Sequence, residues 1–238
     1  MTSPVSDTQS DIASIAARLA KVRERLAKNE REYARVTGSA QLLAVSKTHG
    51  PSHIMAAYDA GQRHFAENYL QEALDKMQQL PADITWHFIG PIQSNKTRAL
   101  AEHFDWVHTV DREKVARRLS EQRPASKPPL NVLLQVNVSG ESSKSGVDLK
   151  DLPALAAVVS SLPHLRLCGL MAIPALSADV DAQRRAFRQL AEARATLLDV
   201  GYASCTELSM GMSQDAEAAV AEGATMLRIG TDIFGKRE

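Results

Sequence analysis

Residues 42–67 read LLAVSKTHGPSHIMAAYDAGQRHFAE, and this stretch contains one complete unit of the fold. The apolar run 42–46 is typical of a buried strand, 52–60 has the pattern of a short helix, and 63–67 indicates a second strand. Gly61 follows the helix, where a left-handed cap is expected. Two strands joined through a helix pair in parallel, so the stretch predicts a right-handed β-α-β crossover.

The same alternation continues along the chain. Further strands are predicted at 86–90, 106–110, 131–138, 165–171, 205–209 and 226–230, and further helices at 70–79, 95–103, 113–122, 149–161, 181–200 and 214–222. Strand-helix units repeated eight times predict an α/β fold, a single (β/α)8 TIM barrel. An open doubly wound sheet is the alternative.

An apolar stripe precedes the first strand. Ile12, Ile15 and Leu19 recur at three- and four-residue steps and predict an additional N-terminal helix. We expect this helix to pack on its own domain rather than to form a coiled-coil seam. Residues 1–10 are expected to be a disordered tail, and 11–238 a single domain.

Composition excludes several classes of function. Lys and Arg number 28, as do Asp and Glu, so no net charge attracts nucleic acid or an anionic membrane. Cys168 and Cys205 form no CxxC pair, which argues against a disulfide framework or a zinc site. With no signal peptide or membrane-spanning run, we expect a cytoplasmic protein.

Barrel enzymes carry their reactive groups where the strands end, and often hold phosphate after strands 7 and 8. Lys47 directly follows the first predicted strand, which places its amine at the barrel mouth. Ser209 and Ser213 follow strand 7, and Gly230 and Thr231 follow strand 8, so the small and hydroxyl-bearing residues suit a phosphate. Ser213 is equally well explained as a helix cap.

An amine beside a phosphate site suggests a ligand that is a phosphorylated aldehyde or ketone, because a partly desolvated lysine attacks carbonyl carbon. The residues alone leave two candidates open. One is a Schiff-base aldolase acting on a sugar phosphate, and the other is a protein that binds pyridoxal 5′-phosphate (PLP).

Seven ordered motifs run from Leu42 to Arg237. They are AVSKT (44–48), FAENYLQE (65–72), HFIG with QSNK (87–90 and 93–96), VN with KSG (136–137 and 144–146), GLMAIP (169–174), LSMGMS (208–213), and RIGT with IFG (228–231 and 233–235). In these motifs the chain resembles the pyridoxal-phosphate homeostasis protein family, whose barrel is similar to the N-terminal domain of bacterial alanine racemase. The resemblance implies PLP as the cofactor.

The resemblance also implies a role for each site residue. Lys47 is the lysine that forms the Schiff base with PLP, and Asn68 lies near the phenolic oxygen of the cofactor. The phosphate-binding positions are Ser209, Gly230 and Thr231. Arg228 faces the pyridine nitrogen, and because arginine does not give up its proton, the ring should be a weak electron sink.

A few positions depart from the family pattern or have no assigned role. Asp232 stands where the family has a small neutral residue, beside the expected phosphate site, and we expect its carboxylate to point outward. His87 is equally well read as a hydrogen-bonded strand residue and as a functional group. Asn95 and Lys96 belong to a motif without a role that the sequence reveals.

The resemblance implies a protein that carries PLP and takes part in vitamin B6 and amino-acid homeostasis without turnover. Apo forms of PLP-dependent enzymes are the implied recipients. The alternative is a PLP-dependent amino-acid racemase that uses Lys47 as one base and an unidentified group, such as Tyr69 or His87, as the other. Because the chain ends just after the eighth strand, we expect no second domain and therefore a monomer.

Overall fold

The computed structural model describes residues 5–139, 145–175 and 177–235, with the side chains of 5–11 left out. Its strands are β1 (Gln41–Val45), β2 (His64–Glu67), β3 (Thr85–Phe88), β4 (Trp106–Val110), β5 (Leu130–Gln135), β6 (Leu165–Met171), β7 (Glu207–Ser209) and β8 (Met226–Ile229). Its helices are α1 (Val5–Glu32), α2 (Pro51–Asp59), α3 (Leu70–Met77), α4 (Thr97–His103), α5 (Glu113–Gln122), α6 (Leu152–Ser160), α7 (Val180–Asp199), α8 (Ala216–Ala221) and α9 (Thr231–Phe234).

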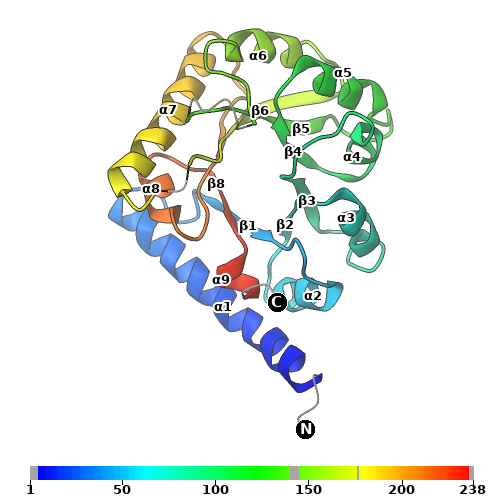
Figure 1. Ribbon diagram of the computed structural model, residues 1–238, viewed down its shortest axis with the longest axis vertical. Helices are drawn as coiled ribbons and strands as arrows, with labels where there is room; N and C mark the ends of the chain where they lie inside the picture. The colour runs from blue at the N-terminus through cyan, green and yellow to red at the C-terminus, as the bar shows by residue number, and fades with distance from the viewer. Residues whose placement is uncertain (1–4, 140–144, 176, 236–238) are drawn as a thin grey trace.

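The strands form a closed parallel barrel in chain order, which confirms the (β/α)8 prediction and rules out the open sheet. Each strand pairs with the next, and β1 closes the ring against β8, with Leu43 opposite Arg228. Figure 1 looks into this ring, with the connecting helices on the outside. All strands run the same way, so their carboxyl ends meet at one mouth, where a site is expected.

Two hydrophobic cores occupy different places in this architecture. The outer core lies between the strands and the surrounding helices and contains large side chains such as Phe65, Phe104 and Phe187. The inner core lies inside the barrel and is much smaller; its buried members are Leu43, Val45, Ala66, Leu133, Cys168, Met171 and Met226. Alternate strand residues point into each core, as the two-residue period of a strand requires.

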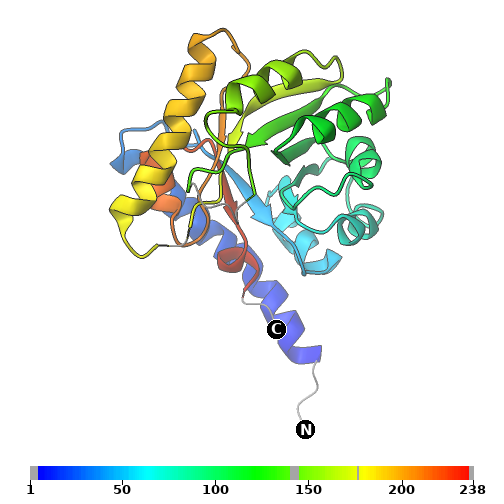
Figure 2. The same cartoon turned by 45° about the horizontal axis from the view of Figure 1, so that its top comes forward.

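Helix α1 packs along the outside of the barrel against α2, α8 and α9. Ile15 and Leu19 are fully buried in the outer core, which confirms a helix packed on its own domain. Figures 1 and 2 both show its N-terminal end extending beyond the barrel. The helix begins at Val5, inside the segment expected to be a tail, because polar residues continue the helix before its apolar stripe starts.

Most element boundaries lie within a few residues of the predictions, with two informative differences. Strand β7 begins at Glu207 instead of residue 205, although Cys205 is buried. Helix α9 was not predicted at all, because four residues are too few to show a helical period. Lys144 and Arg237, which belong to or bound the quoted motifs, lie outside the described residues.

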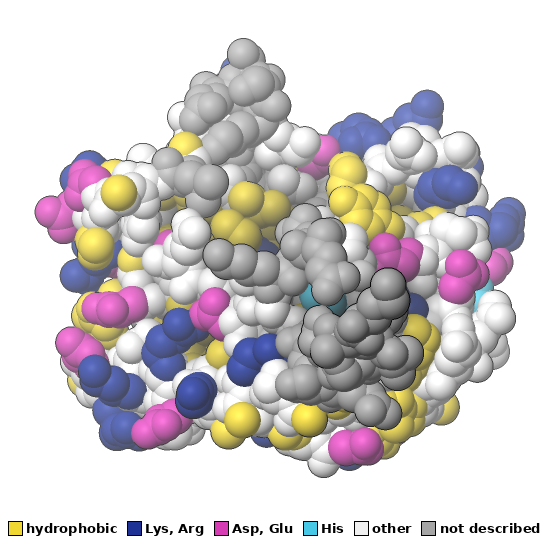
Figure 3. All heavy atoms as spheres, turned by 60° about the horizontal axis from the view of Figure 1, so that its bottom comes forward, with side chains coloured by type: hydrophobic (Ala, Val, Ile, Leu, Met, Phe, Trp, Pro, Cys, Tyr) yellow, Lys and Arg dark blue, Asp and Glu magenta, His cyan; other side chains and the backbone are white. Residues whose placement is uncertain are grey.

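Within the described ranges, no helix is long and apolar enough to cross a bilayer. On the face shown in Figure 3, basic and acidic side chains are interspersed, in keeping with the equal numbers of each in the sequence.

Candidate functional site

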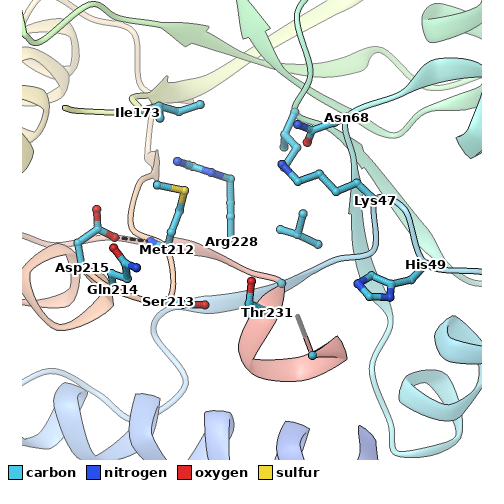
Figure 4. Close-up of a pocket in the computed structure, with 14 residues that line it drawn as sticks. Lys47, His49, Asn68, Ile173, Met212, Ser213, Gln214, Asp215, Arg228 and Thr231 are labelled. Carbon is cyan, nitrogen blue, oxygen red and sulfur yellow. Dashed lines mark hydrogen bonds between the residues drawn. The ribbon is translucent and has the colours of Figure 1, made fainter. Parts of the chain in front are cut away.

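A cavity of about 290 Å³ opens at the carboxyl ends of the strands. Residues from both ends of the sequence line it: Val45, Lys47, His49, Asn68, Ile89, Ile173, Met212, Ser213, Gln214, Asp215, Arg228, Gly230, Thr231 and Gly235. In Figure 4, Lys47 and Asn68 lie on one side of Arg228, and Met212, Gln214 and Asp215 lie on the other. The closed barrel therefore brings together five of the six predicted site residues, Lys47, Asn68, Arg228, Gly230 and Thr231.

The backbone on both sides of Lys47 is held from α3. Lys76, which is buried, donates to the Ser46 carbonyl at 2.8 Å and to Glu67 at 2.8 Å. Glu72 accepts from the Thr48 N–H at 2.6 Å. Thr48 has φ +69, a left-handed conformation that is costly for a β-branched residue. These contacts hold the strained turn and so fix the direction in which Lys47 leaves β1.

Asn68 is placed by a close backbone contact between the ends of β2 and β3. A Cβ atom on Gly90 would lie 2.0 Å from the Asn68 carbonyl oxygen, so only glycine fits there. The Asn68 Oδ1 atom is buried and finds no hydrogen-bond partner among the described residues. A buried acceptor without a partner costs stability, so this atom is expected to meet a donor from a ligand or water.

A tight turn after β7 directs four residues toward the cavity. Gly211 has φ +89, and a Cβ atom there would lie 2.5 Å from Ala219 and 2.6 Å from Leu227. Beyond it the Met212 N–H donates to Asp215 at 2.6 Å, which closes the turn. Burial raises the pKa of Asp215, whose carboxyl group lines the cavity.

The β8–α9 junction presents Gly230 and Thr231 to the same cavity. A Cβ atom on Gly230 would lie 3.1 Å from the Val45 carbonyl oxygen, so the chain passes close to β1 at this point. Within α9, Ile233 is the first residue whose backbone N–H donates to a carbonyl of the same turn. The backbone N–H of Thr231, at the start of the helix, has no such backbone partner in the described part of the chain. Such a junction of small residues and helix start suits an anion.

Helix α1 holds α9 from outside. Arg18 donates to the Ile233 carbonyl at 2.7 Å, and Arg25 forms an ion pair with Asp232 at 2.5 Å. Asp232 therefore points away from the cavity toward α1, which confirms the expected outward orientation. Nothing in the sequence had singled out Arg25 as the partner of Asp232.

Arg228 is 3% exposed, and among the described residues no carboxylate lies within ion-pair distance of it. Its guanidinium donates to the Ser209 hydroxyl at 2.7 Å and to the Ala172 carbonyl at 2.9 Å. Burial lowers its pKa to about 10, and the nearby Asp215 opposes that shift. A buried cation held by neutral oxygens favours an electron-rich ligand in the cavity beside it.

The resemblance implies a phosphate-binding role for Ser209, but this residue does not line the cavity. Its side chain is fully buried below the cavity, where the hydroxyl contacts Arg228 and His108. The sequence did not distinguish Ser209 from Ser213 because both flank the same turn; Ser213 is the one that lines the cavity. The turn at Gly211 separates the two environments.

The other residues considered from the sequence lie away from the cavity lining. Tyr69 is 52% exposed at the start of α3, and His87 is fully buried inside the barrel. Asn95 and Lys96 are exposed before α4. Neither residue considered as a second base therefore lines the cavity. The cavity lining also includes Met212, Asp215, His49 and Ile173. The sequence motifs had predicted no role for these residues.

Known proteins share this barrel fold. The family model described as alanine racemase, N-terminal domain, matches residues 22–238. Among solved structures, alanine racemase from Corynebacterium glutamicum has a TM-score of 0.69 at 19% identity, covering 95% of this chain and 61% of that one. The fold and site thus define an alanine-racemase-like barrel of the N-terminal-domain type.

Relatives with higher sequence identity identify the family of the chain. The pyridoxal phosphate homeostasis protein of Pseudomonas aeruginosa is 57% identical over 229 residues, or 95% of this chain and 97% of that protein. The one from Escherichia coli K12 is 52% identical over 228 residues, or 94% and 97%. The chain belongs to the pyridoxal phosphate homeostasis protein family. PipY of Synechococcus elongatus, solved with PLP bound, has a TM-score of 0.81 at 41% identity, covering 93% of this chain and all of that one.

Proposed function

We propose that this chain binds PLP in the cavity at the barrel mouth and holds it as a Schiff base on Lys47. The relatives named for PLP homeostasis and the PLP-bound PipY structure support this ligand. PLP supplies a reactive aldehyde and a ring that can withdraw electrons when it is bound. The Lys47 amine would condense with that aldehyde, forming a C=N bond and releasing water.

The residues of the cavity fit such a ligand, and the buried Asn68 Oδ1 carries the argument. This acceptor has no partner among the described residues, and it lies on the same side of the cavity as Lys47. A polar group on the ligand beside the attached aldehyde would therefore meet the Asn68 amide. The phenolic oxygen of PLP is such a group.

Arg228 is proposed to face the pyridine nitrogen. With a pKa of about 10 it remains charged at neutral pH and can only donate hydrogen bonds. The ring nitrogen would then accept a hydrogen bond instead of carrying a proton. An electron sink weakened in this way favours holding the cofactor over amino-acid chemistry.

For the phosphate we propose Ser213, Gly230 and Thr231. All three line the cavity, and they come from the two loops that commonly hold phosphate in barrels of this kind. Ser209 is left out of this set because its hydroxyl already binds Arg228.

The biological role proposed is a carrier that takes up and releases PLP without turnover, with apo PLP-dependent enzymes as recipients. Tyr69 and His87, two groups considered as a second base, both lie off the cavity lining, which supports the carrier role over a racemase. Incubating the loaded protein with each L-amino acid should leave its chirality unchanged. Racemisation that disappears in Lys47→Ala would overturn the carrier role.

PLP titration followed by visible absorption tests the binding itself. The wild type should develop the band of a Schiff base and saturate, whereas Lys47→Ala should give only the spectrum of free or non-covalently held PLP. Lys150→Ala is the matched control, because Lys150 is a surface lysine whose side chain is 78% exposed. A band that persists in Lys47→Ala would reject the assignment of this lysine.

We also propose that the protein acts as a monomer in the cytoplasm. Two buried free cysteines, with pKa values raised by burial to about 11 for Cys168 and about 12 for Cys205, suit a reducing compartment. Light scattering of the loaded protein should give the mass of one chain, and a stable dimer would contradict the monomer.

A further inference from the structure

A line of polar side chains crosses the inside of the barrel below the cavity. Arg228 donates to Ser209 Oγ at 2.7 Å, and Ser209 Oγ lies 2.9 Å from His108 Nδ1. His108 Nε2 lies 2.9 Å from His87 Nδ1, and His87 Nε2 lies 3.1 Å from His64 Nδ1. The line runs from the cavity wall to His64, the first residue of β2 and thus near the opposite end of the barrel.

The surroundings of this line disfavour charge on the imidazoles. His87 and His108 are fully buried, and burial lowers the pKa of His87 well below its usual value and that of His108 to about 3. Arg228 lowers the pKa of His108 further, because two cations would stand close together. Trp106 stacks on the His87 ring, with centroids 5.5 Å apart and planes 12° apart, which holds the ring plane.

Neutral imidazoles and a donor-only arginine fix the direction of the hydrogen bonds. Because Arg228 cannot accept, Ser209 must accept from it, and the hydroxyl proton must go elsewhere. His108 Nδ1 is the acceptor for that proton, so His108 carries its own proton on Nε2 and donates to His87. The same logic places the proton of His87 on Nε2, directed at His64.

The opposite direction of the hydrogen bonds would leave the Ser209 hydroxyl proton without an acceptor. If His108 donated from Nδ1, Ser209 would accept twice, and its hydroxyl proton would find no acceptor among the described residues. A buried hydroxyl proton without a partner costs stability. The histidines therefore determine which way the serine hydroxyl points.

We propose that Ser209, His108, His87 and His64 form a neutral hydrogen-bonded column that positions Arg228 toward the cavity, with each imidazole protonated on Nε2. Of the five N–H donors of Arg228, one binds Ser209 and one binds the Ala172 carbonyl. The other three meet no hydrogen-bond partner in the described part of the chain and so remain for a ligand. His108 acts as a positioning residue through Ser209, and His87 and His64 act through His108.

The first test needs no cofactor and therefore does not depend on the proposed function. Nitrogen NMR of the apoprotein, labelled with heavy nitrogen in histidine, reports the protonation of each ring. Signals assigned with His64, His87 and His108 variants should show three neutral Nε2–H imidazoles at neutral pH. A protonated His87 or His108, or an Nδ1–H tautomer at either, would overturn the column.

The second test asks whether the column acts on the ligand, and it rests on the proposed function. His108→Leu removes the acceptor for the Ser209 proton and should weaken PLP binding about tenfold, equivalent to about 1.4 kcal/mol. The visible band of bound PLP should shift because Arg228 is no longer fixed. His108→Asn offers an amide oxygen near the original Nδ1 position and should recover most of the affinity and the band position.

Controls separate positioning from general damage to the barrel interior. Met226→Leu changes a buried inner-core residue outside the column and should leave affinity and band near the wild type. If His108→Leu does not fold, Ser209→Ala removes a single oxygen and should give the same band shift. A wild-type band and affinity in the folded His108→Leu or Ser209→Ala variant would reject the positioning role, whereas failure of the wild type to bind PLP would reject only the proposed function.

Discussion

The outer and inner cores of this barrel differ in size, chemistry and consequence. The outer core is continuous and filled with large apolar side chains, including fully buried Phe65, Phe104 and Phe187. The inner core is small and shares the barrel interior with the column that leads to Arg228. Burial in the outer core supplies stability, while the hydrogen-bonded column inside the barrel is proposed to orient Arg228 toward the cavity.

The largest expected effect is a loss of stability from the outer core. Phe104 is 1% exposed and packs edge-on against Phe88, with ring centroids 5.3 Å apart. Phe104→Ala should lower the free energy of unfolding by about 3–5 kcal/mol, because it leaves a cavity. Chemical denaturation measures the loss, and the folded protein should keep the wild-type PLP band.

Val36→Ala is the matched control, because Val36 is 79% exposed and should change stability by less than about 0.5 kcal/mol. A Phe104→Ala protein with wild-type stability, or with a displaced PLP band, would break the division between the two cores.

The second-largest effect should be a loss of affinity for PLP. In Gly90→Ala the new Cβ atom would lie 2.0 Å from the Asn68 carbonyl oxygen, so Asn68 must move. Strain of about 1–3 kcal/mol is expected, with PLP binding weakened by tenfold or more. Fluorescence or absorbance titration gives the affinity.

Gly50→Ala provides the comparison, because a Cβ atom there meets nothing within 4 Å and the backbone φ is −75°. It should bind PLP as the wild type does. Equal affinities for the two alanine variants would show that Asn68 is not positioned by this contact.

A smaller effect should come from an outer contact that reaches the site. Arg25→Ala leaves Asp232 without its ion pair beside the proposed phosphate position. PLP binding should weaken by about fivefold or less, since exposed pairs contribute about 1 kcal/mol at most. Pyridoxal, which lacks the phosphate, should bind unchanged.

The double variant Arg25→Ala/Asp232→Asn should recover the affinity for PLP, because it lacks the uncompensated negative charge of Asp232. If the double variant stays as weak as the single one, Arg25 acts by holding α9 in place rather than by neutralising Asp232.

The smallest effect is expected at the surface between α7 and α8. Glu222 accepts hydrogen bonds from Arg188 and Arg184, which hold its pKa below the usual range. A lowered folded-state pKa contributes stability at neutral pH that is lost as the pH falls through it. Glu222→Gln should therefore cost less than about 1 kcal/mol at neutral pH, and the gap from wild type should close in acid.

Chemical denaturation of both proteins at neutral and acidic pH measures this difference in the free energy of unfolding. The contradicting result is a difference that persists in acid. Such a result would mean that packing, and not charge, accounts for the contribution of Glu222.

The strands and their ends were predictable because strands buried on both faces appear as apolar runs, and polar residues such as Lys47 follow where such a run ends. Two parts were not. Helix α9 is too short to show a period, and its position depends on α1, which lies far away in sequence. Ser209 and Ser213 belong to one motif, and only the turn at Gly211 shows which serine reaches the cavity.

The histidine column was missed for a different reason. His87 and His108 each lie beside apolar neighbours in a strand and face inward, and this was the available signal. Their partners come from other strands, so the hydrogen bonds appear only when the barrel closes. His87 alone could therefore be read in either of two ways from the sequence.

The attachment proposed for PLP on Lys47 can be located directly. Borohydride converts a Schiff base into a stable secondary amine, so reduction of the PLP-loaded protein followed by peptide mass mapping locates the attachment. We expect a single pyridoxyl adduct, on the peptide that contains Lys47. An adduct on another lysine, or none while PLP remains bound, would contradict it.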